Sequence, residues 1–300
     1  MNFLKIKNFS NSDNFTEVES KDIIVNKVKD FYNFKPFPHY KDNDNKNTIL
    51  EKGNKNLLTK EFKKKVGFNK RILEVGCGTG QLSSYLSIGT NNNVVAMDAT
   101  KESLKLANEF AKKNNLQNIH FLNADIFDDV LKDNFFDFIW CSGVLHHTKN
   151  PHEAFKIIVK SLKQNGYILV GLYNKIGRVR TKFRKLLFKI FGKKILLIID
   201  PTLRNLKKDS DEQIAWIRDQ YQHPVESMHT LDEVINWFDK NSLEFVSSIP
   251  SANYDNEDYE NLFKKTSEGN FFSRIFNQII MIFNNLGRDG GLFIVIGRKK

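Results

Sequence analysis

Cysteine is scarce in this sequence, and its scarcity excludes two classes of protein. Only Cys77 and Cys141 occur among the 300 residues. Two thiols are too few for a disulfide-stapled fold, and their separation fits no metal-ligand spacing. We therefore expect neither a disulfide framework nor a metal site.

Long apolar runs are also absent. No stretch reaches the roughly 18 uncharged apolar residues that a membrane-spanning helix needs. The best one, 271–287, is interrupted by Arg274 and by several amide side chains. Residues 1–7 lack the apolar region of a signal peptide. These absences predict a cytoplasmic protein.

Acidic residues are nearly missing from one segment. The chain has 46 Lys and Arg against 35 Asp and Glu, which gives a formal charge of +11. Residues 175–208 contain 12 of the basic residues and only one acid, Asp200, so this window carries the whole excess. Because the net charge of all other residues is zero, the protein is not basic over its whole surface, as a general nucleic-acid-binding protein would be.

What the sequence does contain is an alternation of short apolar, β-rich runs with helical patterns. Such alternation is typical of a parallel sheet with crossover helices. The predicted strands are 72–75, 94–97, 119–122, 136–140 and 167–172, followed later by 243–249 and 292–296. The predicted helices are 80–87, 101–113, 151–162, 231–240 and one around 271–283. We expect an α/β fold: a doubly wound, Rossmann-like sheet with helical cap insertions.

The same pattern divides the chain into four parts. Residues 1–60 form an N-terminal arm, 61–173 the sheet core, 174–230 a basic helical insertion, and 231–300 a return to the core. The last part includes a second helical excursion at 250–290.

A glycine-rich loop follows the first predicted strand. Residues 73–80 read Leu-Glu-Val-Gly-Cys-Gly-Thr-Gly, which places three glycines where the next helix begins. Glycines let the backbone turn tightly and approach a ligand, with the helix N-terminal amides facing it. The G-x-G-x-G spacing differs from the G-x-G-x-x-G of dinucleotide sites. The preceding acid, Glu74, would repel a pyrophosphate but suits a ligand with an amino group and a sulfonium.

Two further carboxylates follow neighbouring predicted strands. Asp98 ends the second strand, where a carboxylate can accept hydrogen bonds from both hydroxyls of a ribose. Asp125 follows the third strand, where it can accept from an exocyclic adenine amine. Open α/β sheets bind ligands at this edge.

Residues 71–173 resemble the core of class I S-adenosylmethionine-dependent methyltransferases, in the small-molecule group. The resemblance rests on 73–80, 94–98, 124–125, 136–147 (Phe-Asp-Phe-Ile-Trp-Cys-Ser-Gly-Val-Leu-His-His) and 162–167. It implies S-adenosylmethionine as the cofactor and a seven-stranded sheet in the order 3-2-1-4-5-7-6. The residues predicted to bind this cofactor are Glu74, Gly76, Cys77, Gly78, Gly80, Asp98, Ala99, Asp125, Ile126 and Cys141.

Methyl transfer from a sulfonium is an in-line displacement, so the protein mainly positions the acceptor and excludes water. An acceptor that is protonated at neutral pH also needs a base. His147 follows the fourth strand, at a place that often lines the methyl-transfer pocket in related enzymes. His223 lies in the polar stretch 219–229, which we interpret as a wall of the acceptor pocket, with a simple loop as the alternative. These two are the predicted catalytic residues. The predicted acceptor-binding residues are Tyr40, His146, Tyr173, Asn174, Tyr221, Glu226 and His229, with ordinary packing as the alternative.

The N-terminal arm contains an aromatic and proline-rich stretch at 30–40. In similar enzymes this arm folds over the cofactor and the acceptor. Tyr32, His39 and Tyr40 are therefore candidate lid residues, and hydrophobic packing on the sheet is the alternative.

The basic segment has the pattern of an amphipathic helix over 178–199, ended by Asp200 and Pro201. Its apolar face carries Val179, Phe183, Leu186, Leu187 and Ile190, and the opposite face carries Arg178, Lys182, Lys185, Lys189 and Lys193. Three interpretations stay open. The helix packs its apolar side on the core, with helix 271–283 closing the cap; it attaches to an anionic membrane surface; or it contacts phosphates of RNA or of a phosphorylated acceptor.

We therefore expect a methyltransferase that acts on a small-molecule acceptor at oxygen, nitrogen or carbon, either free in the cytoplasm or peripherally on a membrane. Methylation of RNA (tRNA) or of a membrane lipid is the alternative enzymatic function. A cofactor-binding interaction module is the non-enzymatic one. Nucleic acid is the less expected partner, and the sequence does not indicate an oligomeric state.

Overall fold

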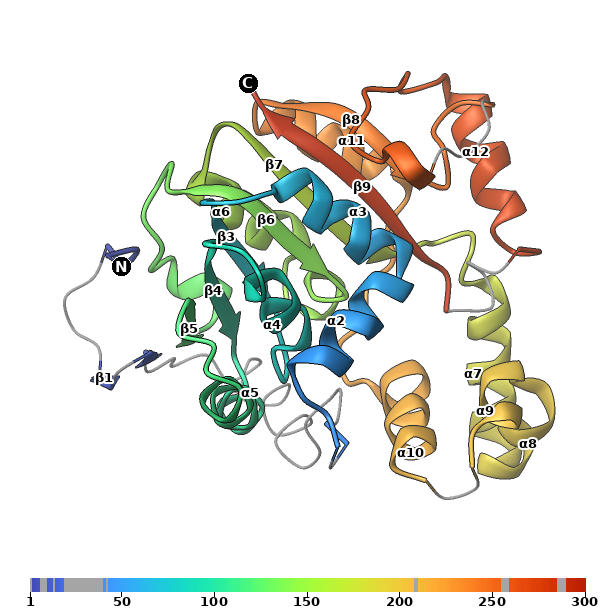
Figure 1. Cartoon of the computed structure of the whole chain (residues 1–300). Helices are drawn as coiled ribbons and strands as arrows, with labels where there is room; N and C mark the ends of the chain where they lie inside the picture. Colours follow the sequence, from blue (N-terminus) through green and yellow to red (C-terminus); the bar gives the residue numbers. More distant parts are fainter. Residues whose placement is uncertain are drawn as a thin grey trace.

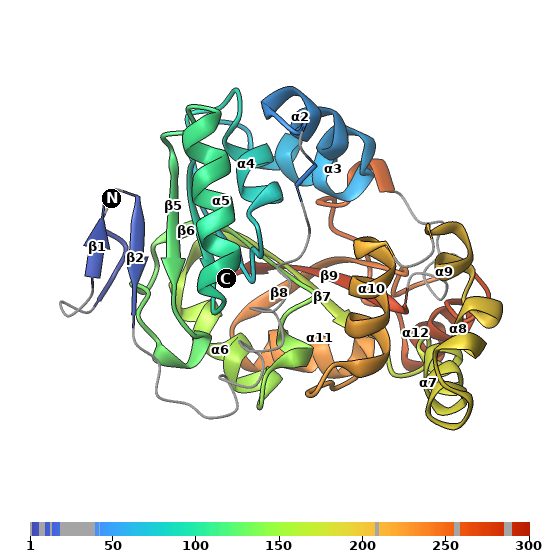
Figure 2. The same cartoon turned by 90° about the horizontal axis from the view of Figure 1, so that it is seen from below.

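The computed structural model describes residues 2–5, 10–12, 14–18, 40–41, 43–207, 210–254, 259–284 and 290–300. They form one sheet with helices on both faces and a group of helices beside it (Figures 1 and 2). The candidate lid residues Tyr32 and His39 lie outside the described residues. Within these ranges, no helix is long and apolar enough to cross a membrane.

The sheet has nine strands in the order β1-β2-β5-β4-β3-β6-β7-β9-β8. They are β1 (Ser10–Ser12), β2 (Phe15–Glu17), β3 (Arg71–Val75), β4 (Asn93–Asp98), β5 (Ile119–Asn123), β6 (Phe136–Ser142), β7 (Leu162–Tyr173), β8 (Leu243–Ile249) and β9 (Leu292–Lys299). The seven strands from β3 to β9 have the implied order 3-2-1-4-5-7-6. The sheet differs from the expectation by two additional strands, because β2 pairs in parallel with β5 and β1 pairs antiparallel with β2.

The core strands are apolar on both faces because helices cover both faces. One face is covered by α2 (Lys46–Lys55), α3 (Leu57–Val66), α4 (Gln81–Ser87) and α5 (Lys101–Lys113), and the other by α6 (Pro151–Ser161) and α11 (Leu231–Lys240) (Figure 2). Ile72 and Leu73 are neighbours on β3, and both are fully buried, one in each of the two hydrophobic clusters. This double burial explains why the strands read as continuous apolar runs.

Between β7 and α11 the chain leaves the sheet and forms a separate group of helices (Figure 1). These are α7 (Val179–Phe191), α8 (Lys193–Ile199), α9 (Pro201–Asn205) and α10 (Asp211–Ile217), which continues into a π-helical turn over Arg218–Gln222. The single helix predicted over 178–199 is thus two helices, since Gly192 takes a φ of 72° at their junction. The polar stretch 219–229 begins within the helical turn that follows α10.

The apolar face of α7 points away from the core. Phe183 is 61% exposed and Ile190 is 62% exposed, whereas Thr181 and Arg184 are buried. The helix α12 (Phe271–Ile280) lies on the same side of the molecule in both views, and its Phe272 is 75% exposed (Figures 1 and 2). The interpretation in which these apolar faces close a cap on the core is therefore wrong.

Candidate active site

The glycine-rich loop joins β3 to α4 at the edge where the parallel strands end. Gly76, Gly78 and Gly80 all have positive φ, between 53° and 71°, which explains why glycine occupies these positions. A Cβ atom at Gly76 would lie 2.2 Å from Cγ2 of Val144, so no side chain fits there. The loop thus brings bare backbone to the edge of the sheet.

Asp98, the last residue of β4, holds this loop in place. Its carboxylate accepts hydrogen bonds from the amide of Gly78, at 2.8 Å, and from the amide of Thr100, at 2.7 Å. Burial raises the pKa of this carboxyl, and the two amide donors act against that rise. A second, deeper carboxyl belongs to Glu74, which accepts from the Ser83 hydroxyl. Burial raises the pKa of Glu74 to about 8, and the nearby charge of Asp98 adds to the rise.

A cavity of about 530 Å³ opens over the loop and over these two acids. This volume is in the range of sites for small molecules and cofactors. Eight of the ten residues predicted to bind the cofactor line it: Glu74, Gly76, Cys77, Gly78, Asp98, Ala99, Asp125 and Ile126. The bare loop and the carboxylate at the end of β4 fit a nucleoside ligand that carries an amino group and a positive charge.

Gly80 and Cys141 do not line this cavity. Gly80 faces Ala107 of α5, whose Cβ would lie 2.9 Å from a Cβ at this position, so the glycine serves close packing of the loop on that helix. The Cys141 side chain is fully buried in one of the core clusters. The next two residues, Ser142 and Gly143, reach the cavity instead.

His147 lies at the far end of the cavity, in the 3-10 turn Leu145–His147 after β6. Its Nδ1 donates to the carbonyl oxygen of Val225 at 2.8 Å, since a carbonyl can only accept. This bond leaves the lone pair on Nε2 while the ring is neutral. Burial lowers the pKa of His147 and keeps the ring neutral at neutral pH.

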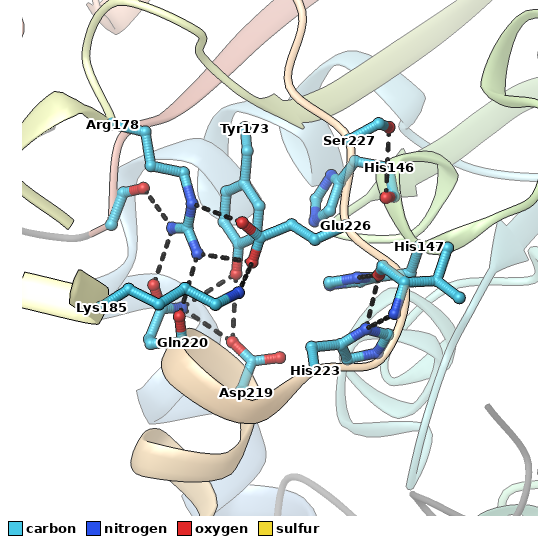
Figure 3. A network of polar contacts seen from close by, with 12 residues as sticks. His146, His147, Tyr173, Arg178, Lys185, Asp219, Gln220, His223, Glu226 and Ser227 are labelled. Carbon is cyan, nitrogen blue, oxygen red and sulfur yellow. Dashed lines mark hydrogen bonds and ion pairs between the residues drawn. The ribbon is translucent and has the colours of Figure 1, made fainter. Parts of the chain in front are cut away.

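His223, the other predicted base, does not line this cavity. Its ring stacks on His147 with 3.6 Å between centroids (Figure 3). His223 also lines a second cavity. Its Nδ1 lies 2.6 Å from the same Val225 carbonyl oxygen. Burial and the neighbouring His147 lower the pKa of His223 to about 3. The structure thus gives His223 a position behind His147.

Tyr173, at the end of β7, is the one predicted acceptor-binding residue that lines the cavity. Its hydroxyl donates to Asp219 at 3.1 Å and accepts from the Gln220 amide at 2.9 Å (Figure 3). The guanidinium of Arg178 lies over its ring, 3.6 Å from the centroid. Burial and the charge of Asp219 raise the pKa of Tyr173, so its hydroxyl stays protonated.

The other predicted acceptor-binding residues have structural partners away from this cavity. Tyr40 donates to the Thr79 carbonyl and stacks on Phe110. Tyr221 donates to Asp200, and Glu226 forms an ion pair with Arg178. His229 contacts Ser227 and Glu233, and Asn174 holds the start of the turn before α7. His146 is fully buried against Tyr173.

Several residues that line the far end of the cavity were not named individually from the sequence, although two of them stand in the stretch 219–229 that was interpreted as a wall of the acceptor pocket. They are Thr148, Lys149, Asp219, Gln220 and Leu292. Asp219 and Gln220 stand directly before the predicted Tyr221, on the helical turn Arg218–Gln222. A helical pattern over 211–222 would have predicted that the neighbours Gln220 and Tyr221 face different sides of the helix, so that only one of them reaches the cavity.

Comparison with known proteins agrees with this geometry. Residues 68–242, more than half of the chain, match the family described as methyltransferase domain. A ubiquinone biosynthesis O-methyltransferase of Rickettsia prowazekii is 32% identical over 105 residues, which cover 35% of this chain and 40% of the relative. An uncharacterized protein of Synechococcus is 25% identical over 199 residues, which cover 59% of this chain and 48% of that protein. The chain therefore spans less than half the length of these relatives.

A solved structure, PKMT2 from Rickettsia typhi, has a similar fold. It superposes with a TM-score of 0.56 at 14% identity, covering 80% of this chain and 52% of that one. The fold and the family match confirm the resemblance inferred from residues 71–173. The chain belongs to the methyltransferase domain family and has the fold of class I S-adenosylmethionine-dependent methyltransferases.

Proposed function

We propose that the chain binds S-adenosylmethionine in the first cavity and methylates a small-molecule acceptor. The observation that carries this proposal is the continuity of the cavity, which runs from the glycine loop and Asp98 to His147 and Tyr173. The family's cofactor supplies a methyl group on a sulfonium. Asp98 would hold the ribose hydroxyls, and Glu74 lies on the cavity wall where a positive charge is favoured.

The far end of the cavity would bind the acceptor. His147 offers a neutral Nε2 there, which can take a proton from a hydroxyl or an ammonium group. Tyr173 and Asp219 form a fixed polar wall, since each is tied to Gln220. A hydroxyl acceptor is favoured by the relatives named as ubiquinone biosynthesis O-methyltransferases.

Binding of S-adenosylhomocysteine by isothermal calorimetry tests the proposal. Asp98→Asn removes the charge but keeps the shape of the side chain. We expect binding to weaken about 30-fold or more, because hydrogen bonds to a charged group contribute roughly 1.5–3 kcal/mol each. Asp129→Asn is the matched control, since Asp129 is a partly exposed carboxylate paired with Lys5. Equal affinities of the two variants would contradict the proposal.

We also propose that the chain attaches to an anionic membrane surface. The outward apolar surface consists of exposed side chains on three helices and just after the last: Val179, Phe183, Leu186, Ile190, Phe191, Ile198, Phe271, Phe272, Phe276, Ile279, Ile280 and Phe283. Exposed lysines flank it at 182, 189, 193 and 194. Apart from the buried Asp200, no acid occurs in 175–207 or 271–284.

This combination favours lipid over a protein partner. Apolar patches larger than a few hundred Å² mark interaction sites, and apolar helices flanked by lysines insert into the boundary of anionic lipid. Arg180 of α7 is linked to the turn just after α12, because its Nη1 donates to the Ile282 carbonyl at 3.0 Å. This hydrogen bond links two of the segments that carry the outward apolar surface, and the positive rim of that surface complements lipid phosphates.

Vesicle co-sedimentation tests the attachment. The double variant Phe183→Ser/Phe276→Ser should lose at least tenfold in binding to phosphatidylglycerol vesicles, since each exposed Phe would bury apolar area in the lipid. Phe68→Ser is the control, because Phe68 is 64% exposed but lies before β3, away from these helices. Unchanged binding by the double variant, or a dimer in solution that this variant dissociates, would count against lipid.

A further inference from the structure

A second cavity of about 360 Å³ lies between α7 and the loop that follows the π-helical turn. Four basic side chains line it: Arg178, which directly precedes α7, and Lys182, Lys185 and Lys189 of α7. They recur three or four residues apart, so they form one stripe along the helix. The methyl-transfer chemistry proposed above uses none of them.

The charges around the second cavity do not balance. Among the residues that the structure describes, Glu226 is the one acid that lines it, and its carboxylate pairs with Arg178 at 2.9 Å. Lys185 lies 3.8 Å from the same carboxylate. His223 adds no charge at neutral pH, since burial lowers its pKa to about 3. The cavity therefore has a surplus of positive charge that suits an anion.

A buried hydroxyl points to the same kind of ligand. Thr181 lines the cavity and is 3% exposed. Its Oγ1 has no hydrogen-bond partner within the described part of the chain. Buried hydroxyl groups normally have a partner, so this donor is available to a ligand that fills the cavity. Three lysines and a free hydroxyl donor match the oxygens of a phosphate.

The second cavity lies between the two features already described. On one side, His223 stacks on His147 and Arg178 stacks on Tyr173, so two ring contacts separate it from the first cavity (Figure 3). On the other side, Leu186 lines the cavity and also belongs to the outward apolar surface. A ligand with a phosphate and an apolar tail would fit both.

We propose that the second cavity binds the phosphate group of an anionic ligand through Thr181 and the lysines of α7. The phosphate belongs either to the headgroup of a membrane lipid or to a soluble phosphate ester. The proposal goes beyond methyl transfer, because it holds whether or not the first cavity binds S-adenosylmethionine.

The test uses the whole 300-residue chain without added cofactor, in two arms. Calorimetric titration with glycerol 3-phosphate measures the soluble source, and co-sedimentation with phosphatidylglycerol vesicles measures the lipid source. Thr181→Val removes the hydroxyl without changing the shape, and Lys182→Gln/Lys189→Gln removes two exposed charges. We expect each variant to weaken binding about tenfold in at least one arm. Lys207→Gln, an exposed lysine outside the cavity, should bind like the parent protein.

The outcomes distinguish a specific phosphate site from nonspecific electrostatic binding. Saturable binding of glycerol 3-phosphate that Thr181→Val weakens supports a soluble phosphate ester. Binding to vesicles alone, with the same loss in Thr181→Val, supports a lipid headgroup. If Thr181→Val binds as well as Lys207→Gln in both arms, the proposal is overturned, even where the double lysine variant loses affinity. Absence of binding in both arms overturns it as well. The thermal unfolding temperature of each variant, compared with that of the parent protein, serves as the control for a retained fold.

Discussion

The sheet layers and the helices of residues 174–230 differ in the size of their apolar clusters and in the charged side chains that they bury. The sheet is packed between two large apolar clusters that contain residues from nearly every strand and from six covering helices. The helical region has a small cluster of its own, made of Leu196, Leu203, Ile217 and Tyr221. It also buries charged side chains, among them Arg178, Arg184 and Asp200. The comparison indicates that apolar burial stabilises the sheet, whereas polar contacts organise the helices.

Asp200 shows how those polar contacts work. Its carboxylate accepts from the indole nitrogen of Trp216 at 2.9 Å, from the Tyr221 hydroxyl at 2.7 Å, and from the amide of Thr202 at 2.8 Å. One buried acid thus links α8, α9 and the end of α10. Phe188 of α7 packs against the small apolar cluster, whereas most of the other apolar side chains of α7 face outward.

The largest effect expected from this contrast concerns stability. Phe155 of α6 is fully buried between Trp237 and Phe238. Phe155→Ala should lower the free energy of unfolding by about 4 kcal/mol, since it removes buried apolar surface and leaves a cavity. Phe183→Ala on α7 should change it by less than about 0.5 kcal/mol without lipid. Urea unfolding of both variants measures the difference. Similar losses in the free energy of unfolding would contradict the contrast between the sheet and the helical region.

The two stacked histidines give the next effect. Once turnover against cell-extract fractions has identified the acceptor, His147→Asn should reduce kcat about 10²-fold, because it removes a general base. His223→Asn should reduce kcat less than tenfold, since His223 does not line the first cavity. Cofactor binding should survive in both variants. If His223→Asn reduced kcat more than His147→Asn does, the general base would be His223 in the helical insertion and not His147 in the core.

The smallest effect concerns Glu74 and pH. Burial raises its pKa from 4.5 to about 8, so the carboxyl is mostly protonated at pH 7 in the empty cavity. A cationic ligand favours the ionised form, so binding should release a proton and strengthen roughly fivefold from pH 7 to 8.5. Calorimetry in buffers of different ionisation enthalpy measures this proton. In Glu74→Gln the affinity should change less with pH. In Glu153→Gln, at an exposed site on α6, the affinity should depend on pH as in the parent protein. Proton uptake on binding would contradict the assignment.

The core and the cofactor end of the site could be predicted from the sequence because local constraints determine them. Gly76 needs a positive φ and has no room for a side chain, and Asp98 ends a strand whose neighbours are set by the order of the sheet. Such features depend on a few adjacent residues. The same holds for the strands, whose apolar runs follow from burial on both faces.

The acceptor end and the helical region could not be predicted in the same way. An amphipathic pattern on α7 distinguishes two faces but does not say which one meets water. That choice depends on contacts such as Arg178 with Glu226, which are 48 residues apart. The role of Tyr221 also depends on a residue distant in the sequence, because its hydroxyl donates to Asp200, 21 residues away, while the adjacent Gln220 reaches the cavity.

The two additional strands bear on how the protein behaves at high concentration. Without them, β5 would be the edge strand, with the backbone donors and acceptors of five residues unpaired along one side. β2 covers part of that side, and the outermost strand, β1, is three residues long. Long open edges invite pairing between copies of a chain and seed aggregation, whereas very short ones offer little to pair with. The strands β1 and β2 thus shield this edge of the sheet from edge-to-edge self-association.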